Sequence, residues 1–225
     1  MKISHKKYAV SSTILTIIVC FLMGFIDAYT FLVQDEVFAS AQTGNFVSMS
    51  AKLFSGEWQE ALSHVWVIAG FAAGAFAGEA MLDRYKEKGF AKYRYFLFFQ
   101  SILLLFLAIF EKRTEDLIIL IALGLLAGFV LTTFRNVNET MVNNGIMTGN
   151  LRNLMGFFYQ MIFRKDAEAK RHLVNLAATI LIFVLGVGAG TLTILLNADY
   201  HLWAAFFIST GAFAWALLSP ALSKP

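Results

Sequence analysis

Ala41-Gln42-Thr43-Gly44-Asn45-Phe46 has a second version in this chain, Gly145-Ile146-Met147-Thr148-Gly149-Asn150-Leu151, about a hundred residues later. Each copy follows an apolar run that begins with Gly-Phe, at Gly24-Phe25 and at Gly128-Phe129, and that later reaches Thr-Phe before it turns polar. One Thr-Gly-Asn tripeptide would mean little. Two copies in matching places predict an internal repeat.

The composition indicates a membrane protein. The chain has 225 residues, of which 58% are hydrophobic and 15% are charged, and its mean hydropathy is +0.66. A soluble domain is less apolar than this. The net charge of +3 does not indicate a nucleic-acid partner, because the basic residues lie in short loops between apolar runs. We therefore expect the lipid bilayer as the partner.

Six apolar runs are long enough for helices that cross the hydrocarbon core, which takes about 20 residues. Continuous apolar runs favour helices over barrel strands, in which polar and apolar residues alternate. The sequence therefore predicts an all-α membrane protein in a single integral membrane domain, residues 1–225. The expected spans are Thr13–Val33, Ala61–Leu82, Tyr95–Phe110, Leu117–Phe134, Leu173–Leu196 and Leu202–Ser219.

The first run has some features of a secretory signal peptide. Lys2, Lys6 and Lys7 precede it, and Ala39-Ser40-Ala41 resembles a cleavage site. The run is too long for a signal peptide, and Ala39 lies too far beyond it, so we expect a retained first span. Cys20 lies within this run and, as the single cysteine, forms no intrachain disulfide.

Loop charges orient the predicted helices. Lys52, Lys112 and Arg113 fall on one side, and the remaining fifteen of the eighteen Lys and Arg residues fall on the other. The positive-inside rule makes the larger set cytoplasmic, which predicts N-in and C-in topology. The larger set comprises Lys2, Lys6, Lys7, Arg84, Lys86, Lys88, Lys92, Arg94, Arg135, Arg152, Arg164, Lys165, Lys170, Arg171 and Lys224.

The repeat has a topological consequence. If each unit contains three spans, at about residues 8–112 and 113–221, the second must enter the membrane from the opposite side. The two units would then be inverted repeats related by a pseudo-two-fold axis in the membrane plane. This predicts the first Thr-Gly-Asn at the outer face after span one and the second at the inner face after span four.

The connections that follow spans one and four are long for structureless loops. We expect each Thr-Gly-Asn to start a helix that lies in the membrane interface or re-enters the bundle. Thr43, Asn45, Thr148 and Asn150 can cap a helix N-terminus through their side-chain oxygens, while glycine permits the turn.

Small residues at four-residue spacing predict close helix packing, within one chain or in a homodimer. The glycines with this spacing are Gly70, Gly74 and Gly78 in span two, and Gly186 and Gly190 in span five.

Asp27 is the most informative single residue. It lies inside the first span, where a carboxylate costs a few kcal/mol unless it faces a partner, water or the bundle interior. Two interpretations stay open: a carboxylate that binds a cation or proton, and a structural hydrogen bond to a neighbouring helix.

Arg135 follows the fourth span and opens a polar segment. It can snorkel to lipid phosphates, or it can contribute to a site for a small polar solute. Weaker candidates, each also explained by an interhelical hydrogen bond, are Glu79, Gln100 and Asn175. The candidates for substrate binding or coupling are Asp27, Thr43, Gly44, Asn45, Arg135, Asn138, Glu139, Thr148, Gly149 and Asn150.

Enzyme signatures are missing from the sequence, which contains no His-Glu-x-x-His, no Gly-x-Ser-x-Gly and no phosphate-binding glycine loop. The four histidines are dispersed, at His5, His64, His172 and His201, and no two share ligand spacing. We therefore expect no catalysis, no metal and no cofactor.

The pattern Gly24-Phe25-Ile26-Asp27-Ala28-Tyr29, then Phe38, then Thr43-Gly44-Asn45 resembles the YoaK-type family of bacterial membrane proteins, catalogued as a domain of unknown function. The resemblance covers nearly the whole chain and implies a six-span inner-membrane protein with a transport role. The second half departs from the family pattern. Where members tend to have Gly-x-Gln-Asn-Ala before the arginine, this chain has Gly128-Phe129-Val130-Leu131-Thr132-Thr133-Phe134 before Arg135.

These observations favour a small secondary transporter or permease for a polar or ionic solute, coupled to an ion or proton through Asp27. The alternative is a membrane scaffold, assembly factor or sensor that transports nothing. Transport predicts both Thr-Gly-Asn segments beside a central polar cavity lined by Asp27 and Arg135, whereas scaffolding predicts them at the headgroup level over a dry core.

Overall fold

The computed structural model describes residues 2–219, with side chains from residue 10 onward. Six of its helices are long and apolar enough to cross a membrane, and they match the six predicted spans. The predicted all-α, multi-pass membrane protein is therefore confirmed. The six helices are α1 (Lys2–Val33), α3 (Trp58–Arg84), α4 (Ala91–Phe110), α5 (Asp116–Thr133), α7 (Ala167–Leu196) and α8 (His201–Leu218).

Local chemistry marks several helix ends. Asp166 caps α7, because its Oδ1 accepts a 2.9 Å hydrogen bond from the backbone N–H of Glu168. Asp116 lies in the first turn of α5, where a carboxylate interacts favourably with the helix dipole. Short 3-10 turns join several helices, at η1 (Lys86–Lys88), η2 (Glu111–Arg113) and η3 (Ala198–Tyr200).

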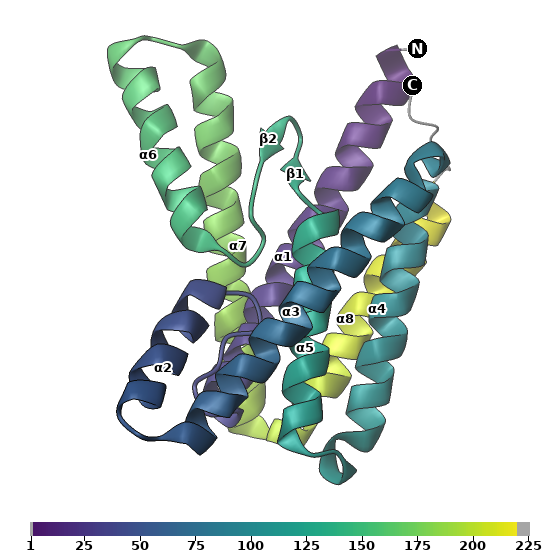
Figure 1. Cartoon of the computed structure of the whole chain (residues 1–225). Helices are drawn as coiled ribbons and strands as arrows, with labels where there is room; N and C mark the ends of the chain where they lie inside the picture. Colours follow the sequence, from purple (N-terminus) through teal and green to yellow (C-terminus); the bar gives the residue numbers. More distant parts are fainter. Residues whose placement is uncertain (1, 220–225) are drawn as a thin grey trace.

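Two shorter helices follow the Thr-Gly-Asn copies, α2 (Gln42–Phe54) and α6 (Met147–Phe163). At 1.5 Å per residue they are about 20 and 26 Å long, less than the thickness of a hydrocarbon core. α2 folds back along α3, and α6 folds back along α7 (Figure 1). A two-stranded hairpin, β1 (Asn136–Val137) and β2 (Thr140–Met141), lies between α5 and α6.

Both short helices begin near the middle of the bundle and run toward opposite ends (Figure 1). Each helix buries only its asparagine, Asn45 or Asn150, and lies along the outside of the bundle, so the expectation that these helices lie in the interface or re-enter the membrane stays a prediction. The prediction that the motif copies lie at opposite faces is wrong. Ser40 and Gly145, which precede the two motifs, are in contact, since a Cβ added at Gly145 would overlap the Ser40 side chain. The far ends of α2 and α6 occupy the two opposite ends of the molecule instead.

The glycines predicted to pack helices do so within the chain. α3 lies against α5, and α1 lies against α7. A Cβ added at Gly70 or Gly74 would overlap the carbonyl oxygen of Ile121 or Leu125 in α5. Such contacts bring the backbones together at a distance that no larger residue permits.

The glycines of α7 repeat this arrangement. A Cβ at Gly186 would overlap the Phe21 carbonyl oxygen of α1, and one at Gly190 would lie 2.7 Å from that of Phe25. Gly78, at the end of the α3 stripe, likewise faces α5, since a Cβ added there would lie 2.9 Å from the Cβ of Thr132.

α1 and α5 lie at the centre of the bundle, and α4 and α8 pack together on one side (Figure 1). The predicted interhelical role of Gln100 is found here, because its Nε2 donates a 3.0 Å hydrogen bond to Ser209 Oγ of α8. The surrounding core is apolar, with fully buried Leu22, Ile26 and Leu123 among its members.

Fourteen of the fifteen basic residues of the larger set belong to described elements or loops, and Lys224 lies outside the described residues. The start of α1, the α3–α4 connection and the α6–α7 connection share one end of the molecule (Figure 1). At the other end Lys112 forms a 2.5 Å ion pair with Asp199, which joins the α4–α5 and α7–α8 connections.

Candidate functional site

The carboxylate of Asp27 lies where the two motif segments meet. Asp27 is 5% exposed, and its Oδ1 accepts a 2.9 Å hydrogen bond from the backbone N–H of Ser40. Its Oδ2 pairs with the Ser40 hydroxyl. The same hydroxyl lies 3.1 Å from the carbonyl oxygen of Gly145. Asp27, Ser40 and Gly145 therefore link α1 to both motif segments, and we call them the crossing triad.

The crossing triad holds an acid without a paired base. Among the ion pairs of the described residues, none includes Asp27. Ser40 and the backbone of Ala39 donate to the carboxylate, so among the described residues its charge is balanced by hydrogen bonds rather than by a cation. Such a group can accept a proton or a small cation without breaking an ion pair.

Asn45 fixes the first segment through a two-bond clamp. Its Oδ1 accepts a 2.9 Å hydrogen bond from the N–H of Phe38, and its Nδ2 donates a 2.6 Å hydrogen bond to the carbonyl oxygen of Phe38. Nδ2 also lies 2.9 Å from Gln42 Oε1. The side chain therefore ties the first turn of α2 to the segment that leads into it.

Asn150 forms the same clamp in the second segment. It bonds the N–H of Asn143 at 2.9 Å and the carbonyl oxygen of Asn143 at 2.7 Å, again seven residues back. Met147 Sδ, at 3.6 Å, replaces the amide oxygen of Gln42. Both asparagines are fully buried.

These contacts correct the predicted capping role of the motif. Ala41 and Ile146 occupy the N-cap positions, without a side-chain cap hydrogen bond, and the asparagines lie inside the helices. Each asparagine bonds the preceding segment instead, because a primary amide can satisfy a backbone N–H and C=O together.

The other motif residues have separate environments. Gly44 and Gly149 lie within helical first turns rather than in the predicted turn. A Cβ at Gly44 would lie 3.0 Å from the Phe38 ring, so its role is close packing. Thr43 and Thr148 are both exposed.

A cavity of about 490 Å³ opens beside the crossing triad, between α1, α7 and the start of α6. Asp27, Thr148 and Thr191 supply polar groups to a lining that is otherwise mainly apolar. Asp27 and Thr148 thus line one cavity, but Thr43, Asn45 and Asn150 are not part of its lining, and the lining is less polar than the transport hypothesis predicts.

Arg135 is not part of this centre, and that prediction is wrong. Its guanidinium forms a 2.5 Å ion pair with Glu79 of α3, and both side chains are about half exposed. Arg135 lies two residues beyond Thr133, where α5 ends, and there the carboxylate of Glu79 is close enough to form an ion pair with its guanidinium.

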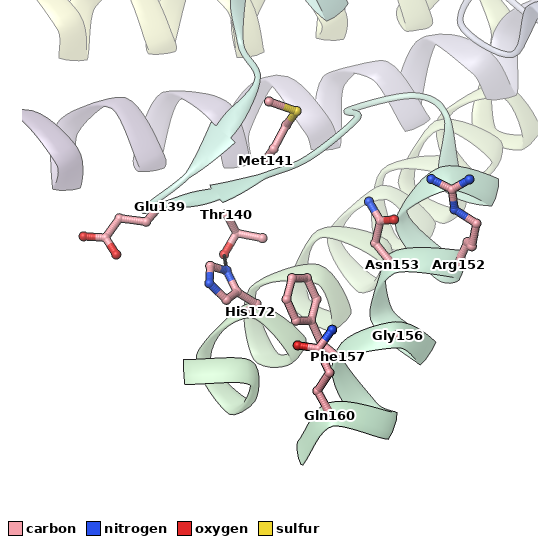
Figure 2. A pocket seen from close by; sticks show the side chains of 9 residues that line it. All are labelled: Glu139, Thr140, Met141, Arg152, Asn153, Gly156, Phe157, Gln160 and His172. Carbon is pink, nitrogen blue, oxygen red and sulfur yellow. Dashed lines mark hydrogen bonds between the residues drawn. The ribbon is translucent and has the colours of Figure 1, made fainter. Parts of the chain in front are cut away.

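Another cavity, of about 550 Å³, lies between the β-hairpin, α6 and α7 (Figure 2). We call it the end cavity. Glu139 lines it and forms a 2.5 Å ion pair with Arg171. Asn138 contacts α1 instead, because its N–H donates to Thr13 Oγ1 at 2.6 Å.

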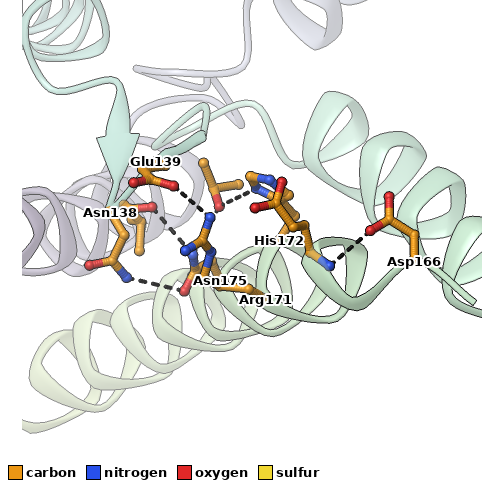
Figure 3. Close-up of polar contacts among 9 residues, drawn as sticks. Asn138, Glu139, Asp166, Arg171, His172 and Asn175 are labelled. Atoms are coloured by element: carbon orange, nitrogen blue, oxygen red, sulfur yellow. Dashed lines mark hydrogen bonds and ion pairs between the residues drawn. The ribbon is translucent and has the colours of Figure 1, made fainter.

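Polar side chains of α7 hold the hairpin beside the end cavity (Figure 3). Thr140 Oγ1 lies 2.8 Å from His172 Nδ1 and accepts a 2.9 Å hydrogen bond from Asn175 Nδ2. This network explains Asn175, a weaker candidate in the sequence, as a structural residue.

The sequence alone did not identify Ser40, and of the residues that line the end cavity it gave only Glu139 as a candidate. Ser40 stood out only as part of a sequence resembling a cleavage site, although its position thirteen residues after Asp27 leaves room for a return of the chain. Within the part of the chain that the structure describes, no three His, Cys, Asp or Glu side chains lie together as metal ligands.

Residues 15–215 match the family described as "Protein of unknown function (DUF1275)". The chain belongs to this family. The match spans both Thr-Gly-Asn copies and all six long helices of this DUF1275 member in whole or in part. The comparison confirms the resemblance to an uncharacterised family. Neither the curated proteins nor the solved structures include a match to the chain.

Proposed function

We propose that this protein is a secondary transporter or permease for a small polar or ionic solute, built from two inverted repeats. The observation that carries the proposal is the crossing triad, where the two short helices α2 and α6 begin beside a buried carboxylate without an ion-pair partner and beside a cavity. Transporters with inverted repeats bind solutes at such breaks near the middle of the membrane, between the repeats.

The first support for a repeat is the correspondence of close contacts. Gly24 of α1 meets the carbonyl oxygen of Phe183 in α7, and Gly128 of α5 meets that of Phe71 in α3. In the reverse direction Gly186 meets Phe21 as Gly74 meets Leu125. The α1–α7 pair therefore reproduces the α5–α3 pair with the roles of the two halves exchanged.

The second support is the direction of the elements. α1 and α5 run in opposite directions, as do α2 and α6, α3 and α7, and α4 and α8 (Figure 1). Together with the matched Asn45 and Asn150 clamps, this relation favours a pseudo-two-fold axis that passes near the contact of Ser40 with Gly145.

The proposed mechanism is a rocking movement of one repeat against the other, with Asp27 as the coupling group. Protonation or cation binding at Asp27 would compete with the Ser40 hydrogen bonds. Since Ser40 also contacts Gly145 of the other repeat, the occupancy of Asp27 would change the contact between the repeats. The proposed orientation places the end of the molecule with the larger basic set in the cytoplasm.

Purified protein in liposomes provides the test, with flux measured for protons, sodium, amino acids and weak acids. We expect flux for at least one solute and a loss of at least about tenfold in Asp27→Asn, which keeps the shape but removes the charge. Asp35→Asn is the matched control, because Asp35 is an exposed residue in the turn after α1. Equal flux in wild type and Asp27→Asn would refute the coupling role. No flux for any solute would favour the scaffold alternative.

A further inference from the structure

We propose that the end cavity binds a small organic carboxylate, with Arg152 as its charged anchor. This inference deepens the proposed transport function, because it names a solute class and an entry site. The hairpin, α6 and α7, which line the cavity, lie toward the end of the molecule that carries the larger basic set, so the cavity would receive a solute from the cytoplasmic side (Figure 1).

Arg152 is the first argument. It is the one charged residue in α6 and lies in the second turn, close to the helix N-terminus. A cation there opposes the helix dipole, which favours negative charge at this end. Among the ion pairs of the described residues, none includes Arg152. A bound anion would supply the missing charge and would also interact favourably with the helix end.

The polar lining is the second argument. Asn153 and Gln160 lie seven residues apart on α6 and so share the helix face that borders the cavity (Figure 2). Neither side chain has a hydrogen-bond partner among the contacts of the described residues, so both amides are free to bind a solute. The other charges of the cavity wall, Glu139 and the neighbouring Arg171, neutralise each other.

The empty space beside Gly156 is the third argument. Gly156 lies between these two residues, and a Cβ added there would meet no atom within 4 Å. The cavity therefore has room directly above the helix, and a larger side chain at this position would fill it without a clash.

The lining also favours an organic anion over inorganic phosphate. Met141 of the hairpin and Phe157 of α6 add apolar surface to the cavity lining. One guanidinium forms two parallel hydrogen bonds with a carboxylate, and the apolar surface suits a short carbon body. A solute with one negative charge would balance the one positive charge of Arg152.

Binding can be measured without transport by saturation-transfer NMR on the purified protein in phosphatidylcholine nanodiscs. The probes are butyrate, benzoate and succinate, with butyramide as the uncharged counterpart of butyrate. We expect a signal for at least one carboxylate and at least tenfold weaker binding of butyramide than of butyrate. Absence of binding for all three carboxylates would overturn the proposal.

Two variants locate the site. Arg152→Gln and Gly156→Leu should each weaken carboxylate binding at least tenfold. Their matched controls are Arg164→Gln, an arginine at the far end of α6, and Gly188→Leu, a helical glycine of α7 that also faces open space. Unchanged binding in Arg152→Gln or Gly156→Leu would place the carboxylate elsewhere and refute the inference.

Two further outcomes separate the alternatives. If phosphatidylglycerol in the nanodisc abolishes butyrate binding, Arg152 belongs to a lipid-headgroup site and the inference fails. If butyrate binds but no solute crosses liposomes, the binding site stands and the transport proposal fails. If flux occurs and Arg152→Gln leaves both flux and binding unchanged, transport stands and the site fails.

Discussion

Removal of the Asn45 and Asn150 clamps tests the structure most directly, because the same side chain makes the same two backbone bonds in each half. Asn45→Ala and Asn150→Ala each delete a bond to an N–H and a bond to a carbonyl oxygen. A buried hydrogen bond contributes about 1 kcal/mol to stability, so each clamp contributes about 2 kcal/mol.

The two variants should differ by a predictable amount. Asn45 also donates to Gln42 Oε1 at 2.9 Å, whereas the third contact of Asn150 is a 3.6 Å approach to the sulfur of Met147. A thioether is a weak acceptor, so Asn45→Ala should cost about 3 kcal/mol and Asn150→Ala about 2 kcal/mol.

The free energy of unfolding can be measured by titration with sodium dodecyl sulfate in mixed micelles, with helix content followed by circular dichroism. Asn153→Ala serves as the control, since Asn153 lies on the same helix as Asn150 and borders the end cavity. If both clamp variants stay within about 0.5 kcal/mol of wild type, the range of uninvolved surface substitutions, the clamps do not hold the two segments.

Three further predictions concern packing, charge and topology. Gly74→Ala should destabilise the protein by about 1–3 kcal/mol in the same titration, because the added Cβ would overlap a backbone oxygen of α5, whereas Gly188→Ala, in open space, should be neutral or stabilising. Arg135→Gln should change stability by at most about 1 kcal/mol and leave solute flux within about twofold of wild type, because the ion pair of Arg135 with Glu79 is half exposed. A loss of flux as large as in Asp27→Asn would show that Arg135 contributes to the solute site. Cysteines introduced at Ser55 and Lys165 should react with an impermeant maleimide from opposite sides of sealed vesicles, and labelling from one side would rule out the inversion.

The apolar runs were sufficient to predict all six long helices, because twenty consecutive apolar residues have few other stable conformations in a membrane. The glycine spacing correctly predicted close helix packing as well. The spacing did not identify the partner helices. Any helix backbone can pack closely against Gly74, and the structure shows that its partner is Leu125 of α5.

The functional residues were predicted less well, for a physical reason that differs between positions. The side chain of Asn45 can cap a helix. The neighbouring residues in the sequence do not show that it bonds the backbone N–H and C=O of Phe38, seven residues earlier, instead. Arg135 was assigned to the solute site because Glu79, its ion-pair partner, is 56 residues away in the sequence. Asp27 was identified from its cost in a membrane, which depends only on its own position.

The contact between Ser40 and Gly145 limits how alike the two halves can become. If these residues occupy equivalent places near the pseudo-two-fold axis, a side chain on one fills the space that a side chain on the other would need. Two copies of the Asp27 half could not form this centre, because two serines would collide there.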